Sequence, residues 1–326
     1  MSDDNMKKLL LAICCLTLLQ SFWASAQSFP TKTITMVVPF PPGGSTDQMA
    51  RALAPKLQES LGQSVIIDNK AGATGTIGAA FVKRAPADGH TLLVTSLGPL
   101  VIVPHLMASI PYNPVNDFDY LTVGVQSPNV LVVPANSPYK SLSDLISALK
   151  QNPGKLSFGS SGSGSSDHLA TEIFWQQTST SGIHVPYKGG GPAITDAVGG
   201  QLDALFANIN SVIQFINAGK LKPLALAGNK RSTVIPNVQT FEELGYRDVV
   251  SYGWQAVLAP KGLPPEVKAK LSKSLLAALN DPVVKKSFVD EGYEVVANSP
   301  EQFVQFQAQE NQKWKTLIES RHISAN

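Results

Sequence analysis

The chain has 326 residues and a formal net charge of +2; 43% of its residues are hydrophobic and only 15% are charged. This charge balance excludes the basic stripe that nucleic-acid binding requires, so we expect no nucleic-acid partner. The length is sufficient for a large apolar core, and the 25 glycines and 23 prolines predict many tight corners.

The sequence lacks the motifs of several enzyme classes. It contains no Walker phosphate-binding sequence, no dinucleotide fingerprint and no Gly-x-Ser-x-Gly nucleophile turn. Its histidines show neither the paired spacing nor the acidic neighbours of a metal site; they are His90, His105, His168, His184 and His322. We therefore expect a binding protein rather than an enzyme, with no catalytic residue, no metal and no cofactor.

The N-terminus predicts export. Two lysines precede an apolar run over residues 9–19, and Ala24-Ser25-Ala26 offers the small residues of a cleavage site. We expect residues 1–26 to be a signal peptide and the mature chain to begin at Gln27. A membrane-spanning helix is the alternative, but the run is shorter than the roughly 18 to 20 residues that cross a bilayer.

Both cysteines, Cys14 and Cys15, lie within this run. The mature chain would therefore contain no thiol and no disulfide, although it enters an oxidising compartment. Its stability would depend on the apolar core alone, and we expect the protein in a bacterial periplasm.

In chain order, the mature sequence begins with alternating strands and helices. Apolar periodicity predicts strands at 34–38, 64–68 and 91–95, with helices at 46–61 and 74–84 between them. This is a βαβαβ unit, which implies a parallel sheet with right-handed crossovers.

The middle of the chain forms a second unit. Two β-rich runs within 120–133 flank Gln126-Ser127-Pro128-Asn129 without a helix pattern between them, and we interpret them as a crossing into another lobe. The elements expected there are helices at 142–151, 166–177 and after the glycines at 189–191, and strands at 155–158, 183–186, 202–206 and 222–227.

The chain then returns to the first unit. Residues 249–259 are β-like, and helices are expected at 263–278, 282–291 and 300–320. The sequence thus predicts an α/β protein with lobe 1 over 27–125 and 250–326 and lobe 2 over 126–249. Two crossing strands would join the lobes, forming a hinge with a cleft beside it.

Three glycine-rich loops stand between a strand and a helix: residues 39–47, 158–168 and 187–192. Glycine lets the backbone come close to a ligand, and the start of the following helix stabilises an anion. Ser45 and Gln48 match a capping box, and Pro192 suits a first helical position. The alternative for each loop is a simple corner or flexible connector.

Five segments occur in this order along the chain: Val38-Pro39-Phe40-Pro41-Pro42-Gly43-Gly44-Ser45-Thr46-Asp47, Asp68-Asn69-Lys70-Ala71-Gly72, Ser160-Ser161-Gly162-Ser163-Gly164-Ser165-Ser166-Asp167-His168, Val185-Pro186-Tyr187-Lys188-Gly189-Gly190-Gly191-Pro192 and Gly200-Gln201-Leu202-Asp203. With these segments the chain resembles the Bug family, the periplasmic solute-binding components of tripartite tricarboxylate transporters. The resemblance runs over the whole mature chain.

The resemblance implies a type II periplasmic-binding-protein fold, which closes like a Venus flytrap on a small carboxylate solute. The solute would be passed to the permease subunits of the transporter, and we expect the receptor to be a monomer. In such proteins backbone groups, hydroxyls and waters hold the carboxylate, and these three loops contain no arginine. Several donors from both lobes are needed for a micromolar site, so we expect tight binding to require closure.

The motif positions assign roles to residues of both lobes. Lobe 1 would supply an apolar contact, donors and a turn-orienting carboxylate from Phe40, Gly43, Gly44, Ser45, Thr46 and Asp47, with a lining from Thr95, Ser96 and Gly98. Lobe 2 would supply donors from Ser161, Gly164, Ser165 and Ser166, with His168 packing or orienting the loop and Ala207 and Asn208 closing the far wall. Related chains often have an acidic residue where Ala207 stands, which suggests a solute without a cationic amine or recognition by neighbouring carbonyls.

Two other functions fit parts of the pattern. A sensor that presents its ligand to a membrane kinase would share the fold, and the sequence does not separate it from a transport receptor. An exported hydrolase would use Ser161 or Ser165 with His168 and Asp167. The sequence argues against the hydrolase. Neighbouring residues on one helix turn point to different faces, so a nucleophile, a base and an orienting carboxylate do not easily line up there.

Overall fold

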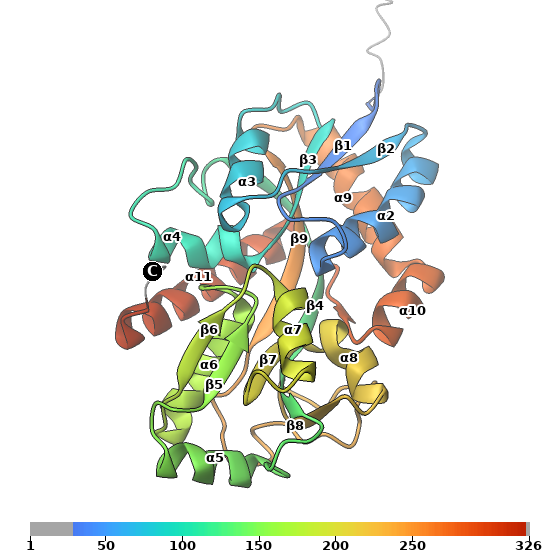
Figure 1. Ribbon diagram of the computed structural model, residues 1–326. Coiled ribbons are helices and arrows are strands. Elements are labelled where there is room, and N and C mark those ends of the chain that lie inside the picture. Colours follow the sequence, from blue (N-terminus) through green and yellow to red (C-terminus); the bar gives the residue numbers. More distant parts are fainter. Residues whose placement is uncertain (1–28, 324–326) are drawn as a thin grey trace, which may run out of the picture.

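The computed structural model describes residues 29–323, so the expected signal peptide lies outside the described residues. Figure 1 shows two α/β lobes, one above the other, with strands β4 and β9 running between them. None of the helices in residues 29–323 is both long and apolar enough to cross a lipid bilayer.

Lobe 1 is built on a parallel sheet whose central strand is β1 (Ile34–Val38). Its neighbours are β2 (Val65–Asn69) and β3 (Thr91–Ser96), both parallel to it. Helices α2 (Ser45–Leu61), α9 (Pro265–Asn280) and α10 (Pro282–Asp290) bury their apolar residues on one face, and α3 (Thr76–Lys83) and α11 (Pro300–Arg321) cover the other. Both faces are therefore apolar, as a parallel sheet requires.

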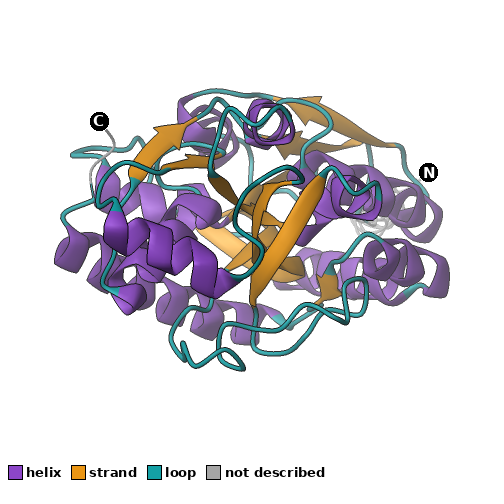
Figure 2. Ribbon diagram, turned by 60° about the horizontal axis from the view of Figure 1, so that its bottom comes forward, coloured by secondary structure: helices purple, strands orange, loops and turns teal. Residues whose placement is uncertain are grey.

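Lobe 2 repeats the plan with a smaller sheet. Strand β5 (Ser157–Ser160) lies between β6 (Ile183–Pro186) and β7 (Ala204–Asn208), all parallel, and β8 (Leu221–Ala227) pairs with β4. Helices α5 (Leu142–Gln151), α6 (Ser166–Thr178), α7 (Gly190–Val198) and α8 (Ile209–Asn217) surround these strands. Figure 2 shows helices on both sides of the strands in a view from the lower lobe.

The two lobes share one long strand, β4 (Phe118–Pro134). Up to Pro128 it pairs with β9 (Tyr252–Pro260), and from Asn129 onward it pairs with β7 and β8. The expected pair of separate β-rich runs is therefore a single strand. Proline interrupts most central strands because it donates no hydrogen bond, but Pro128 stands where β4 changes partners.

The strand directions bring the predicted loops together. The last residue of β3, Ser96, pairs with Gln255 near the crossing, and the last residue of β7, Asn208, pairs with Asn129 at the crossing. Because β1 and β2 run with β3, and β5 and β6 run with β7, the carboxyl ends of both parallel sheets face the gap between the lobes. Open α/β sheets bind ligands at this edge.

Several expected boundaries were wrong. Helix α3 begins at Thr76 rather than Thr74, because Ala73–Gly75 form a 3₁₀ turn in which Thr74 has a positive φ of 53°. Helix α7 begins at Gly190, so Pro192 is its third residue and not its first. Strand β5 starts two residues later than expected, at Ser157.

Four elements had no counterpart in the sequence-based prediction. They are a π-helical turn (Gly98–Ile102), α4 (Val103–Leu106), helix α8 and the short strand β10 (Glu294–Val295).

Candidate functional site

The loop after β1 leads directly into α2. Gly43 has a φ of +87°, which is a backbone conformation that glycine adopts without strain, and the helix N-cap is Gly44. The capping box expected at Ser45 and Gln48 is wrong, because Ser45 is already the first helical residue and no side chain caps α2. The amides at the start of this helix lack acceptors within it, and these are the amides to which the sequence analysis assigned anion binding.

Asp47 fastens this loop. Its carboxylate accepts hydrogen bonds from the backbone amide of Gly43 (2.9 Å), from the Nε and Nη2 of Arg51 (2.7 and 3.1 Å), and from the side-chain amide of Asn69 (2.9 Å). Burial would raise the pKa of Asp47, but the hydrogen bonds from Arg51, Gly43 and Asn69 outweigh it and hold this pKa below 3.8. The charge of Asp47 is thus compensated by Arg51 beside it.

The other lobe 1 residues predicted for the site surround the ends of β1 and β3. Phe40 is half-buried, and its ring lies against Gly75, where a Cβ would come within 3.1 Å of it. Thr95 is fully buried, and its hydroxyl has no hydrogen-bond partner in the described part of the chain. Ser96 is half-buried, and Gly98 opens the π-helical turn.

In lobe 2 the corresponding loop follows β5, and Asp167 fastens it. The Asp167 carboxylate accepts from the Ser161 amide (2.6 Å) and the Ser161 hydroxyl (2.8 Å). Asp167 is 5% exposed, and it forms no ion pair within residues 29–323. Burial raises the pKa of this carboxyl above its ordinary value.

Ser165 and Ser166 begin α6. Ser165 is the N-cap: its hydroxyl accepts from the His168 amide (3.3 Å) and donates to the Gly162 carbonyl (2.6 Å). Ser166 is buried, and its carbonyl accepts from the Ser251 hydroxyl (3.0 Å) just before β9. Both hydroxyls predicted as the most direct ligand donors, those of Ser161 and Ser165, therefore have partners within the loop.

His168 orients the same loop. Its Nδ1 accepts from the Gly164 amide (3.1 Å), and its ring stacks on His184 with the centroids 3.8 Å apart. Burial, with His184 alongside, lowers the pKa of His168 to about 3, so the ring is neutral at neutral pH. A hydrolase would need a serine hydroxyl donating to this ring, whereas Nδ1 is occupied by Gly164 and the two serines donate elsewhere.

The far-wall residues lie at the crossing. Ala207 is buried, and the Asn208 amide donates to the Ser127 carbonyl (3.1 Å) and to Asn129 Oδ1 (3.2 Å). A Cβ at Gly253 would come within 2.6 Å of the Asn208 side chain, so only glycine fits there. Asn208 thus secures the strands on which the lobes are joined.

The sequence analysis missed a polar contact that joins the lobes. The Asn210 amide of α8 donates to the Ser45 hydroxyl of α2 (2.9 Å) and to the Tyr293 hydroxyl (2.9 Å). Tyr293 in turn donates to Gln48 Oε1 (3.1 Å). Asn210 follows directly after the predicted wall, but nothing in the sequence signals that Tyr293 lies beside it.

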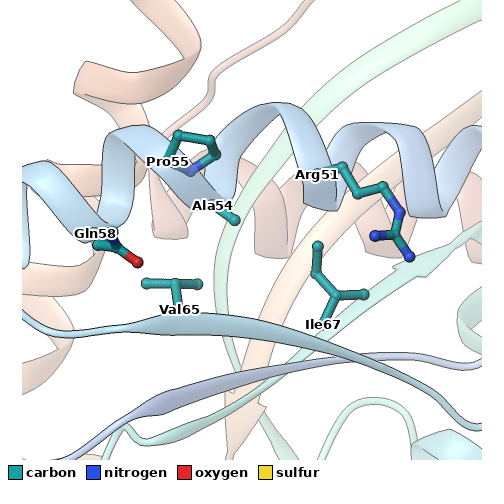
Figure 3. A pocket seen from close by; sticks show the side chains of 6 residues that line it. All are labelled: Arg51, Ala54, Pro55, Gln58, Val65 and Ile67. Carbon is teal, nitrogen blue, oxygen red and sulfur yellow. The ribbon is translucent and has the colours of Figure 1, made fainter.

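A separate groove lies outside the gap. It runs between α2 and β2, and Figure 3 shows Ala54, Pro55 and Gln58 of the helix facing Val65 and Ile67 of the strand, with Arg51 at one end. None of the residues predicted for the solute site lines this groove.

Two lobes with helix starts facing a shared gap define a solute-binding protein. The family model described as tripartite tricarboxylate transporter family receptor matches residues 49–323. The chain belongs to this family of receptors, and the resemblance to Bug proteins and the expected fold class are both confirmed.

Individual relatives agree with this assignment. Protein BugT of Bordetella pertussis is 41% identical over 295 residues, which cover 90% of each chain. The structure of an R. palustris protein with adipate has a TM-score of 0.86 at 33% identity, covering 91% of this chain and 99% of that one. MatC from Rhodopseudomonas palustris with bound malate has a TM-score of 0.81 at 31% identity, covering 89% of this chain and all of the other.

Proposed function

We propose that this protein captures a small carboxylate solute in the gap between its lobes and delivers it to the permease subunits of a tripartite tricarboxylate transporter, working as a monomer in the periplasm. One observation carries the proposal: the starts of α2 and α6 stand at sheet edges that face the same gap, and Asn210 closes that gap onto Ser45. The relatives solved with adipate and malate support a carboxylate as the ligand class.

The electrostatics of the gap suit an anion held by backbone amides. In lobe 1 the charge of Asp47 is compensated by Arg51, so the partial positive charge at the start of α2 remains available to a solute. We propose that the solute carboxylate accepts from the amides of Gly44, Ser45 and Thr46, and that Phe40 provides apolar contact. A hydrogen bond to a charged group contributes about 1.5–3 kcal/mol, so several donors from both lobes would account for micromolar binding.

Substitution of Ser45 tests the amide contact directly. Proline is tolerated at the first position of a helix, and the preceding Gly44 already has the extended backbone that proline demands, with φ −76° and ψ 166°. Ser45→Pro therefore removes the amide hydrogen and the hydroxyl, whereas the matched variant Ser45→Ala removes only the hydroxyl. We expect Ser45→Pro to bind carboxylates about tenfold to hundredfold more weakly than Ser45→Ala.

The measurement is calorimetric titration of the purified mature protein with a panel of dicarboxylates and hydroxycarboxylates of three to six carbons. Unfolding temperatures without solute check that both variants keep the fold. Equal affinities of Ser45→Pro and Ser45→Ala would show that the α2 amides do not hold the solute. No binding of any carboxylate by the unmodified protein would contradict the proposed function itself.

A further inference from the structure

Helix α11 contacts both lobes (Figure 1). Near its start, the Phe303 ring packs on Tyr120 of β4 in lobe 1, with the ring centroids 4.6 Å apart. At its end, the Nε and Nη2 of Arg321 lie 3.1 and 3.0 Å from Glu172 Oε2, in α6 of lobe 2. The two side chains are 31% and 14% exposed, so water screens this ion pair less than it screens a pair on the open surface. An ion pair therefore joins the lobes through α11.

Glu172 lies beside the histidine that orients the lobe 2 loop. It follows His168 by one turn of α6, and its second oxygen, Oε1, is 4.0 Å from His168 Nε2. Because Nδ1 of the neutral His168 ring accepts from the Gly164 amide, the ring hydrogen is on Nε2, the nitrogen nearer to Glu172. Glu172 thus stands between Arg321 and the ring that holds the loop.

Helix α11 also holds the part of lobe 1 on which this loop packs. Asn311 Oδ1 is 2.8 Å from Nε2 of His105 in α4. Leu106, the next residue of α4, lies so close to Gly164 that a Cβ on the glycine would collide with it. One helix therefore contacts both sides of the place where the lobe 2 loop meets lobe 1.

We propose that Arg321 is a positioning residue for solute capture: through Glu172 it holds lobe 2 in the arrangement described here, with the Gly164 loop packed on lobe 1. This inference rests on the proposed function. Within residues 29–323, the hydrogen bond and the ion pair of Arg321 go to Glu172 and to no residue predicted to bind the solute. An interaction that is gained only when the lobes are together raises the fraction of molecules that are ready to bind.

A role in closure differs measurably from a role in the fold alone. If the ion pair only fastened α11, its loss would lower the free energy of unfolding and leave the affinity for solutes unchanged. If it favours closure, the apparent dissociation constant rises as the closed fraction falls. This factor does not depend on the solute, so every carboxylate that binds in the gap should be weakened equally.

Substitutions on both sides of the ion pair test the proposal by calorimetric titration with several dicarboxylates. Arg321→Gln removes the charge and should weaken the binding of each solute about threefold to tenfold. Glu172→Gln should have the same effect, and the double variant should lose no more than either single variant. The matched control is Lys315→Gln, which removes a pair with Glu319 (3.9 Å) within α11 and should leave the affinities unchanged.

The position of the lobes is measured without any solute. Lys150 of α5 and Lys273 of α9 are exposed residues of opposite lobes, and the chain from residue 27 onward contains no cysteine. Spin labels on Lys150→Cys and Lys273→Cys therefore report the distance between the lobes. Arg321→Gln should enlarge the open population of the solute-free protein, and a saturating dicarboxylate should restore the closed one.

The outcomes separate this inference from the function on which it rests. Equal affinities of Arg321→Gln and Lys315→Gln, or label distances that Arg321→Gln leaves unchanged, would overturn the role of Arg321 while carboxylate capture stands. A loss of affinity that differs from solute to solute would overturn it as well, because Arg321 would then act on the site and not through closure. If the unmodified protein binds no carboxylate, the proposed function fails, and the label distances of the solute-free protein still decide whether Arg321 holds the lobes together.

Discussion

The two loops that face the gap are held by the same kind of hydrogen bond, from a backbone amide to an aspartate, but the two aspartates have different neighbours. Asp47 in the first turn of α2 accepts from the amide of Gly43, and Asp167 in the first turn of α6 accepts from the amide of Ser161. Asp47 is paired with Arg51, whose side chain is 55% exposed. Asp167 accepts a second hydrogen bond from the Ser161 hydroxyl and has no cation beside it in the described residues.

The difference shows that the same loop hydrogen bond forms whether or not a cation compensates the aspartate. Both carboxyls are buried, but the charge of Asp47 is compensated by the partly exposed guanidinium of Arg51. In the lobe 2 loop, Asp167 bonds only neutral Ser161, and neutral His168 accepts from the Gly164 amide and stacks on His184. We expect lobe 1 to tolerate changes in its loop and lobe 2 to respond to small changes in packing and pH.

The largest expected effect comes from a methyl group added to each loop. Gly164 has a φ of +78° and a Cβ there would collide with Leu106 Cδ1 of lobe 1 and approach Ile102. Gly43 has a similar φ of +87°, but nothing lies within 4 Å of its Cβ position. Backbone strain is thus common to both sites, whereas overpacking is confined to Gly164.

Gly164→Ala should lower the free energy of unfolding by about 3 kcal/mol, and Gly43→Ala by about 1 kcal/mol. Urea unfolding of the two variants measures the difference. Because Leu106 belongs to the opposite lobe, Gly164→Ala should also weaken solute binding more than Gly43→Ala does. Equal losses in the two variants would mean that the lobe 2 loop does not pack on lobe 1 in solution.

The strand and helix order was predictable from the sequence because it depends on local periodicity. Helix α5 and strand β6 have the predicted bounds, since apolar spacing and flanking turn residues determine both. The start of α2 was misjudged because the helix already begins at Ser45, with Gly44 as its N-cap, and the Ser45 side chain contacts Asn210, 165 residues away. Local patterns describe a capping box well, but they carry no information on such a partner.

The same limit explains the part of the candidate site that was missed. The glycine loops were found because each is a run of consecutive residues whose types alone indicate a turn before a helix. Tyr293 stands in an unremarkable segment before β10, and its role depends on the return of the chain from α10 to the crossing, 83 residues after Asn210. Long-range packing, not local sequence, places it beside Asn210.

A smaller effect is expected from removing the partners of the lobe 1 carboxylate one at a time. Asp47→Ala leaves the backbone amide of Gly43 without an acceptor and removes one of the two acceptors of the Asn69 side-chain amide, which keeps the Phe40 carbonyl, so we expect a loss of about 2 kcal/mol in unfolding free energy. Arg51→Ala should cost clearly less, because Asp47 keeps both of those donors and the Arg51 charge is screened by solvent. Thermal unfolding of both variants checks the order, and a greater loss for Arg51→Ala would mean that the ion pair, not the loop hydrogen bond, maintains this site.

The smallest effect is in the pH dependence, where the two carboxyls should differ in sign. Burial raises the pKa of Asp167 above 3.8, so the folded state binds more protons than the unfolded state just above that pH. The unmodified protein should therefore gain stability relative to Asp167→Asn as the pH falls from about 7 to about 4.

The pKa of Asp47 is lowered, so its contribution to stability is complete above 3.8 and is lost only at more acid pH. The unmodified protein and Asp47→Asn should thus differ by a constant amount over the same range. Urea unfolding at several pH values measures both differences, and parallel curves for Asp167→Asn would show that its carboxyl is solvated rather than buried.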